Sequence, residues 1–301
     1  MNKSRGERPN CKGGLAQPQM PINFRAPHVF VTSEYFLLGL LAKTLLLTAA
    51  AMSVVGVARA QRSEVRVAAA ADLKFAMSDL AQQYEKQTGS KVNATYGSSG
   101  NFFSQIQNGA PFDIFFSADI DYPRKLEVAG LAAPGTLYEY AVGRIVIWMP
   151  ADSTVDLAKQ GWAALLSPSV EKIAIANPAH APYGRAAVAA LRKAGIYQRV
   201  AAKLVYGENI SQAAQFAQSG SAQAGIVALS LATSPPMKDG KLWEIPAEMH
   251  SPIQQAAIVL KGAKNKEAVG AFVEFVKSEV GRATLEKYGF LFPSPDSQAR
   301  P

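Results

Sequence analysis

The chain has 301 residues, 49% of them hydrophobic, so it is long enough to bury one or two cores of ordinary size. Its formal net charge is +8, but seven of its 31 Lys and Arg residues and only two of its 23 Asp and Glu residues precede residue 61. The remainder carries a net charge near +3, which is too weak for a surface that binds nucleic acid.

An apolar run at residues 36–60 predicts a secretion signal. The run ends in Ala-Arg-Ala, the small-residue pattern of a signal-peptidase site, and basic residues precede it. We expect residues 1–60 to be a signal peptide with an upstream extension that the cell does not use, and cleavage after Ala60; Met20 is an alternative start. A permanent membrane anchor is the alternative interpretation, and Lys43 within the run argues against it. The mature protein is therefore expected in the periplasm.

From residue 64 onward, strand-like and helix-like patterns alternate. Strands are expected at residues 65–71, 91–96, 112–119, 144–150, 172–177, 202–206, 223–229 and 251–260. Helices are expected at residues 72–87, 101–107, 123–128, 162–167, 184–193, 211–218, 266–277 and 281–287. In the first helix Asp72 stands at the N-cap position and Gly89 at the C-cap position. This alternation predicts an α/β fold of two lobes, each a mostly parallel sheet flanked by helices.

The residue sets that most enzymes need are not found in the sequence. Gly97-Ser98-Ser99-Gly100 is similar to a nucleophile elbow, but neither serine has a glycine two positions away on both sides. His180 could serve as a base, although a satisfied or exposed loop histidine is the commoner case. The only cysteine, Cys11, precedes the expected cleavage site, and no P-loop or zinc-protease motif is present. We therefore expect neither an enzyme nor a bound cofactor.

Four strand-to-helix junctions carry small or polar residues, at 71–72, 98–100, 181–184 and 209–211. Each helix start offers unpaired N–H groups and the positive end of the helix dipole. In an α/β lobe such junctions lie at the carboxyl ends of the strands, where ligands bind. No Lys or Arg occupies the first two positions of any junction, so the set suits a small anion held between two lobes by N–H groups. Taken singly, each junction is equally well an ordinary helix cap.

Three segments give the sequence a resemblance to a known family: GSSGN with the following QIQNGAPFDIFFSAD, then IAIANPAHAPYGRAAVAAL, and GENISQAAQFAQSGSAQAGIV. They closely resemble the periplasmic molybdate-binding proteins of ABC importers, and the similarity extends over residues 64–292. The resemblance implies the fold of type II periplasmic binding proteins, with the ligand cleft between two lobes. The expected parts are lobe 1 at residues 61–142 and 252–293, lobe 2 at residues 143–251, and a flexible tail at residues 294–301.

The family binds its oxyanion without cationic side chains, and the resemblance implies which positions do so here. The expected ligand-binding residues are Ala71, Asp72, Ser99, Tyr183 and Ile210, supported by Ser98, Gly97 and Gly100. They contact the oxygens of the anion, and no protein atom bonds molybdenum. The Tyr183 hydroxyl is expected to donate to the anion from a lid position, because Ala228 stands where other relatives supply a tyrosine. Gly97 and Gly100 are expected to let the backbone turn tightly beside Ser99, and the plainer interpretation of Ser98 is a helix cap.

The resemblance implies a receptor for molybdate, and tungstate nearly as well, that acts as a monomer and delivers the ion to a membrane permease and its ATPase. A receptor for another tetrahedral oxyanion such as phosphate is one alternative, and a hydrolase with Ser99 as nucleophile is another. Asp72 departs from the family, whose members often carry a neutral hydroxyl or amide there. Either its side chain accepts N–H groups at position 74 or 75 as an N-cap, which we favour, or it accepts a proton carried by an anion such as hydrogen phosphate.

Overall fold

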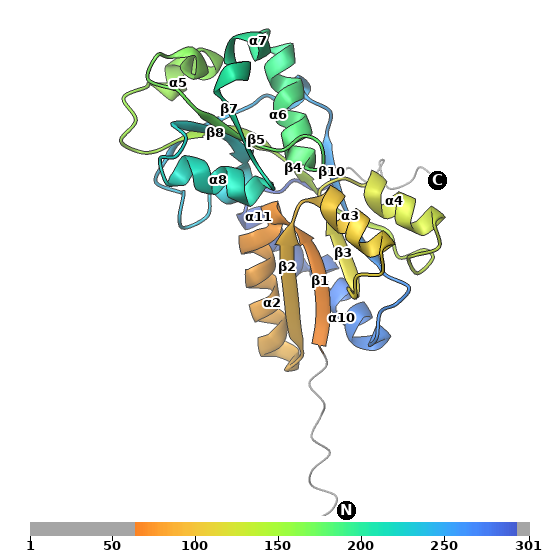
Figure 1. Cartoon of the computed structure of the whole chain (residues 1–301). Coiled ribbons are helices and arrows are strands. Elements are labelled where there is room, and N and C mark those ends of the chain that lie inside the picture. Colours follow the sequence, from red (N-terminus) through yellow and green to blue (C-terminus); the bar gives the residue numbers. More distant parts are fainter. Residues whose placement is uncertain (1–63, 294–301) are drawn as a thin grey trace, which may run out of the picture. The chain divides into compact units, whose positions relative to one another are not determined.

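The computed structural model describes residues 64–293 of the chain (Figure 1). The predicted signal peptide, its cleavage after Ala60, the alternative start at Met20 and the predicted tail lie outside these residues. Within residues 64–293, no helix is both long enough and apolar enough to cross a membrane.

Two five-stranded sheets form the framework, one in each lobe. The first sheet has the order β2-β1-β3-β10-β4 and comprises β1 (Glu64–Ala70), β2 (Lys91–Gly97), β3 (Ile114–Ser117), β4 (Tyr138–Gly143) and β10 (Ile253–Val259). The second has the order β7-β6-β8-β5-β9 and comprises β5 (Ile145–Met149), β6 (Ile173–Ala176), β7 (Leu204–Gly207), β8 (Ala224–Ala228) and β9 (Lys241–Glu244).

Both sheets are mixed, but four of the five strands in each run in the same direction, so the prediction of mostly parallel sheets is confirmed. Neighbouring strands pair in parallel along β2-β1-β3 in the first sheet and along β7-β6-β8 in the second. The remaining pairings, which involve β10 and β4 or β5 and β9, are antiparallel. The difference arises because β5 and β10 reach their sheets by crossing from the other lobe, while a helix crossover produces a parallel neighbour. The first crossing is short, since only Arg144 separates β4 from β5.

Helices flank both sheets. Lobe 1 carries a 3-10 turn at Ala71–Leu73 and the helices α2 (Lys74–Thr88), α3 (Ser99–Gln107), α4 (Asp121–Val128), α10 (Lys266–Lys277) and α11 (Glu279–Lys287). Lobe 2 carries α5 (Leu157–Gln160), α6 (Pro182–Lys193), α7 (Tyr197–Val200), α8 (Ile210–Gln218) and α9 (Leu229–Ala232), with 3-10 turns at Gly161–Leu166 and Ala201–Lys203, and a further turn at Ala247–Met249 follows β9. Most of the predicted helices and strands are thus confirmed to within a few residues.

The strand β3 shows why the sequence gives this layered arrangement. Its four residues, IFFS, are all buried, because helices cover both faces of the first sheet. Phe115 packs against Phe102 of α3, whereas its neighbour Phe116 packs against Phe272 of α10. Because β1 and β3 are parallel, the carboxyl ends of both strands lie at the same edge of the sheet.

Candidate functional site

A small cavity lies at the carboxyl ends of strands from both lobes. Its lining residues are Ala70, Ala71, Asp72, Gly97, Ser98, Ser99, Ala118, Ala181, Pro182, Tyr183 and Ile210. Seven of the eight residues predicted from the sequence are among them, and Gly100 is not. Strand ends and helix starts thus converge on one space, as the rule for ligand sites in α/β folds predicts. Ala118 was missed, although it directly follows the buried strand β3 and occupies the same kind of position.

The start of α3 supplies two buried serines with different partners. The Ser99 hydroxyl oxygen accepts the Ala118 N–H at 2.9 Å, and the hydroxyl proton of Ser99 therefore remains available to another acceptor. Ser98 occupies the N-cap position, but its side chain makes no cap hydrogen bond. Its Oγ lies 2.9 Å from Nδ1 of His180, which comes from lobe 2. His180 is therefore a satisfied loop histidine that joins the two lobes.

Gly97 and Gly100 do not turn the chain in the way the sequence suggested. Neither glycine has a positive φ, so a special backbone conformation does not explain them. Gly100 instead permits a close approach of the two lobes, because a Cβ atom there would lie 2.7 Å from the carbonyl oxygen of His180. The Gly100 N–H donates to that oxygen at 2.9 Å and is thus already paired. At Gly97 the space is limited by the ring of Phe102, 3.0 Å from a built Cβ.

Lobe 2 contributes the starts of α6 and α8. Helix α6 begins at Pro182, whose missing N–H costs nothing in the first turn, and this places Tyr183 in a buried position at the cavity. Helix α8 begins at Ile210, also buried. Its cap is Asn209, whose side chain accepts the N–H groups of the second and third helical residues at 3.0 and 3.1 Å. These sequence features fix both helix starts against the cavity.

Asp72 does not cap the first helix, so the favoured prediction for its side chain is wrong. It lies inside the 3-10 turn, whose N-cap is Ala70, and no side-chain cap hydrogen bond is formed there or at the start of α2. Because Asp72 lies one step into the turn, its carboxylate faces the other elements of the site. Oδ2 accepts the hydroxyl of Tyr183 at 3.0 Å and the side-chain amide of Gln255 at 2.8 Å.

Gln255 of β10 extends this contact into a buried network. Its Nε2 also donates to the Tyr183 hydroxyl at 2.9 Å, and its Oε1 accepts the hydroxyl of Tyr140 at 2.6 Å. Tyr140 lies on β4, the strand next to β10 at the edge of the first sheet. Sequence reasoning missed Gln255 and Tyr140. The available signal was a pair of glutamines in the otherwise apolar stretch IQQAAIV, since a buried amide needs partners.

Burial controls the pKa values of the titratable groups in this network, because no cation among the described residues is paired with them. Burial raises the pKa of Asp72 to about 6, although hydrogen bonds from Gln255, from Tyr183 and from nearby backbone N–H groups act to lower it. Burial and the Asp72 charge raise the pKa of Tyr183 well above its ordinary value. The second carboxylate oxygen, Oδ1, is buried and has no hydrogen bond of ordinary geometry. Within residues 64–293, no Lys, Arg or His side chain hydrogen-bonds or ion-pairs with Asp72.

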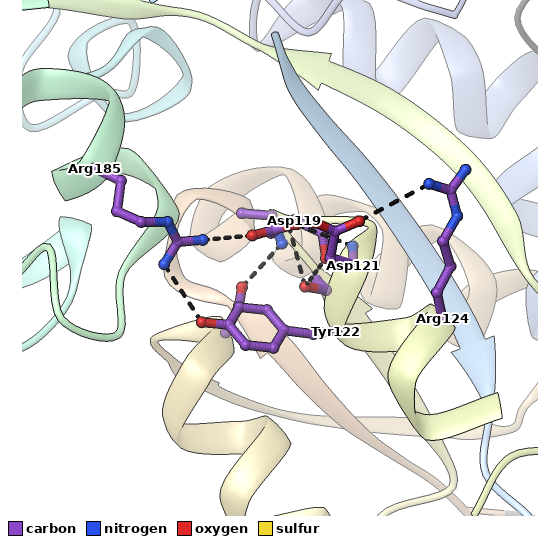
Figure 2. A network of polar contacts seen from close by, with 8 residues as sticks. Asp119, Asp121, Tyr122, Arg124 and Arg185 are labelled. Atoms are coloured by element: carbon purple, nitrogen blue, oxygen red, sulfur yellow. Dashed lines mark hydrogen bonds and ion pairs between the residues drawn. The ribbon is translucent and has the colours of Figure 1, made fainter. Parts of the chain in front are cut away.

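Arg185, two residues after Tyr183, is directed away from the cavity. Figure 2 shows Arg185 of α6 paired with Asp119, which follows β3, while its Nη1 donates to the hydroxyl of Tyr122 at 3.3 Å. These contacts hold the two lobes together at the rim, as does the hydrogen bond between Asn101 and Glu208. The charge of Arg185 is thus balanced outside the cavity. The described cavity lining contains no cationic side chain.

Comparison with known proteins identifies the family. Residues 65–291 match the model of the bacterial extracellular solute-binding proteins. The chain is 42% identical over 236 residues to the molybdate-binding protein ModA of Azotobacter vinelandii, covering 77% of this chain and 91% of that protein. It is 37% identical over 232 residues to ModA of Rhodobacter capsulatus, covering 77% of this chain and 90% of that one.

A solved structure agrees with the sequence comparison. The periplasmic molybdate-binding protein of Azotobacter vinelandii matches with a TM-score of 0.72 and 34% identity, covering 76% of this chain and all of that one. The two mixed sheets and the cavity between them are therefore those of a two-lobed binding protein, and the chain belongs to the family of bacterial extracellular solute-binding proteins.

Proposed function

We propose that this chain is the receptor of an ABC importer and that it captures molybdate, and tungstate nearly as well, in the cavity between its lobes. The observation that carries the proposal is a buried cavity lined by helix starts and hydroxyl groups of both lobes, without a cationic side chain. The relatives named for molybdate binding supply the identity of the anion. The receptor would act in the periplasm as a monomer, without cofactor or nucleic acid, and deliver the ion to a membrane permease and its ATPase.

Each proposed ligand-binding residue has a role that its position supports. Ala71 and Asp72, in the first turn after β1, and Ile210, at the start of α8, offer backbone N–H groups. Ser99 and Tyr183 offer hydroxyl protons. Hydrogen bonds to a charged group contribute roughly 1.5–3 kcal/mol each, so several aimed at one dianion reach sub-micromolar affinity. Sulfate has the same charge and shape, so we expect the size of the cavity to select against it.

One observation favours a second candidate, a receptor for a protonated oxyanion such as hydrogen phosphate. The unpartnered Oδ1 of Asp72 could accept a proton carried by the ligand. The hydrolase alternative receives less support, since the Ser99 oxygen accepts a backbone N–H and the histidine of this region contacts Ser98 instead. A serine without a nearby base is a weak nucleophile. We therefore propose a binding protein that is not an enzyme.

Titration calorimetry with molybdate, tungstate, sulfate and phosphate tests the proposal. We expect saturable binding of the first two anions and none of the others at the same concentrations. The variant Ser99→Ala should weaken molybdate binding, and Ser104→Ala is the matched control, because Ser104 lies exposed on the same helix. Binding of phosphate alone would establish the second candidate, and the absence of heat from molybdate and tungstate would end the proposed assignment.

A further inference from the structure

The side chain of Asp72 shows the hydrogen-bond pattern of a neutral carboxylic acid. Oδ2 accepts two protons, from Tyr183 at 3.0 Å and from Gln255 at 2.8 Å. Oδ1 is buried at the cavity and has no partner. In a neutral acid one oxygen accepts while the other carries a proton that needs an acceptor. Because Asp72 lines the cavity, an anion bound there could accept this proton.

The anion makes an ionised Asp72 unfavourable for two reasons. A carboxylate beside a dianion would place three negative charges in one site whose described lining contains no cation, and like charges disfavour the ionised form. An ionised carboxylate would also keep the single hydroxyl proton of Tyr183, because hydrogen bonds to a charged acceptor are about twice as strong as neutral ones. Protonation of Asp72 removes one charge and makes Oδ2 a weaker competitor for that hydroxyl.

We propose that the oxyanion enters together with one proton from the solvent, which Asp72 binds on Oδ1 and donates to the anion. Binding then converts carboxylate, dianion and proton into a neutral acid hydrogen-bonded to the dianion, and the same proton returns to solvent on release. This inference rests on the proposed function of the cavity. It makes Asp72 a residue through which pH sets the affinity of the receptor.

None of the described groups that face Asp72 titrates near neutral pH, so Asp72 is the group in this network that gains the proton. Tyr183 of α6 and Tyr140 of β4 are the titratable neighbours in the network, and burial raises the pKa of both hydroxyls well above the ordinary value. Gln255 of β10 and Ser230 of α9 are neutral; the Ser230 hydroxyl donates to the backbone oxygen of Asp72 at 2.8 Å. Burial raises the pKa of Asp72 to about 6, so near pH 7.5 the free protein carries the carboxylate and has a proton to gain.

Calorimetry of molybdate binding at pH 7.5 in two buffers with different ionisation enthalpies counts the protons taken up. We expect close to one proton per bound molybdate for the native protein and close to none for Asp72→Asn. Asp152→Asn, at an exposed loop position, should behave like the native protein. Between pH 7 and 8.5 the affinity of the native protein should fall about tenfold per pH unit, while that of Asp72→Asn stays level.

The outcomes separate the two proposals. If molybdate gives no heat, the function proposed for the cavity fails. If molybdate binds without proton uptake, or if Asp72→Asn takes up the same proton, the role of Asp72 is wrong while the function stands. Infrared difference spectroscopy of the native protein needs no variant: the carbonyl band of a protonated carboxyl group should appear when molybdate is added, and its absence would overturn the inference even if Asp72→Asn did not fold.

Discussion

Two aspartates at opposite ends of the first sheet are equally buried, yet they behave in opposite ways. Asp72 follows the carboxyl end of β1 and Asp113 precedes the start of β3, and each side chain is 1% exposed. Burial acts to raise the pKa of both carboxyl groups. At Asp113 two hydrogen bonds from the Arg66 guanidinium, at 3.0 and 2.7 Å, and nearby backbone N–H groups outweigh it and lower the pKa.

The comparison teaches that a cationic partner can outweigh the effect of burial on the pKa of a carboxyl group. Asp113 has a cation that binds it with two parallel hydrogen bonds, and it fastens the backbone of β1 to the segment before β3. Asp72 has only neutral donors, and one of its oxygens has none. The carboxyl group at the Asp113 end of the sheet is therefore fully hydrogen-bonded. The carboxyl group at the Asp72 end, which faces the proposed ligand, has one oxygen without a partner in the described part of the chain.

The two ends of the sheet should show large effects of similar size, and the first comes from removing the cation that binds Asp113. Arg66→Ala removes the cation and leaves the Asp113 carboxylate buried without its charge partner, which should lower the free energy of unfolding by about 3 kcal/mol. Urea denaturation measures this loss. Lys287→Ala is the control, because it breaks an exposed ion pair with Asp79 and should cost little. Equal losses in the two variants would contradict the account given for Asp113.

At the unpaired end, the Asp72 carboxyl group should destabilise the fold, so replacing it should raise the free energy of unfolding. The folded-state pKa of Asp72 is raised from 3.8 to about 6, so between these values the folded protein binds more protons and its stability falls as pH rises. The penalty is complete above pH 6 and is on the order of 3 kcal/mol at full burial. Asp72→Asn should remove it, so without molybdate the variant should gain stability over the native protein as pH rises from 4 to 7.

Urea denaturation across this pH range, without molybdate, gives the difference between the two proteins. Asp113→Asn supplies the contrast, since a lowered pKa stabilises the fold at neutral pH and the stabilisation is lost as the pH falls through the folded-state value. If the difference in the free energy of unfolding between Asp72→Asn and the native protein were the same at every pH, the Asp72 carboxyl would not titrate with the raised pKa that its burial predicts.

Much of the framework that positions these two residues follows from the sequence alone. Alternating strands and helices, together with small polar residues at strand ends, predicted two lobes and most of the cavity lining. The left-handed Gly89 at the end of α2, with φ of 72° and an N–H that reaches Glu85, is confirmed as a C-cap. Such features are local, because they depend on residues within one or two helical turns.

The partners of the two aspartates could not be predicted in the same way. Gln255 lies 183 residues from Asp72 along the chain, and Arg66 lies 47 residues from Asp113. No local pattern encodes such pairs, and a rule for helix caps led to the wrong orientation of Asp72. The neighbouring strands β4 and β10 bring Tyr140 and Gln255 to the site, so their contribution becomes visible only once the strands of the first sheet are placed.

The smallest effect is expected for the Tyr183 hydroxyl, which donates to Asp72 and is proposed to donate to the anion. Tyr183→Phe keeps the buried ring but removes the donor to Oδ2 of Asp72, and with it one proposed hydrogen bond to molybdate. We expect a loss of molybdate affinity of about tenfold, the equivalent of one charged hydrogen bond. Calorimetry measures it, with Tyr84→Phe as the control. Tyr84 is also buried, but its hydroxyl donates to the Ala268 carbonyl oxygen, at 3.4 Å, among the helices behind the first sheet. If both variants bind molybdate as the native protein does, the Tyr183 ring only packs in the cavity wall, and the hydroxyl serves Asp72 alone.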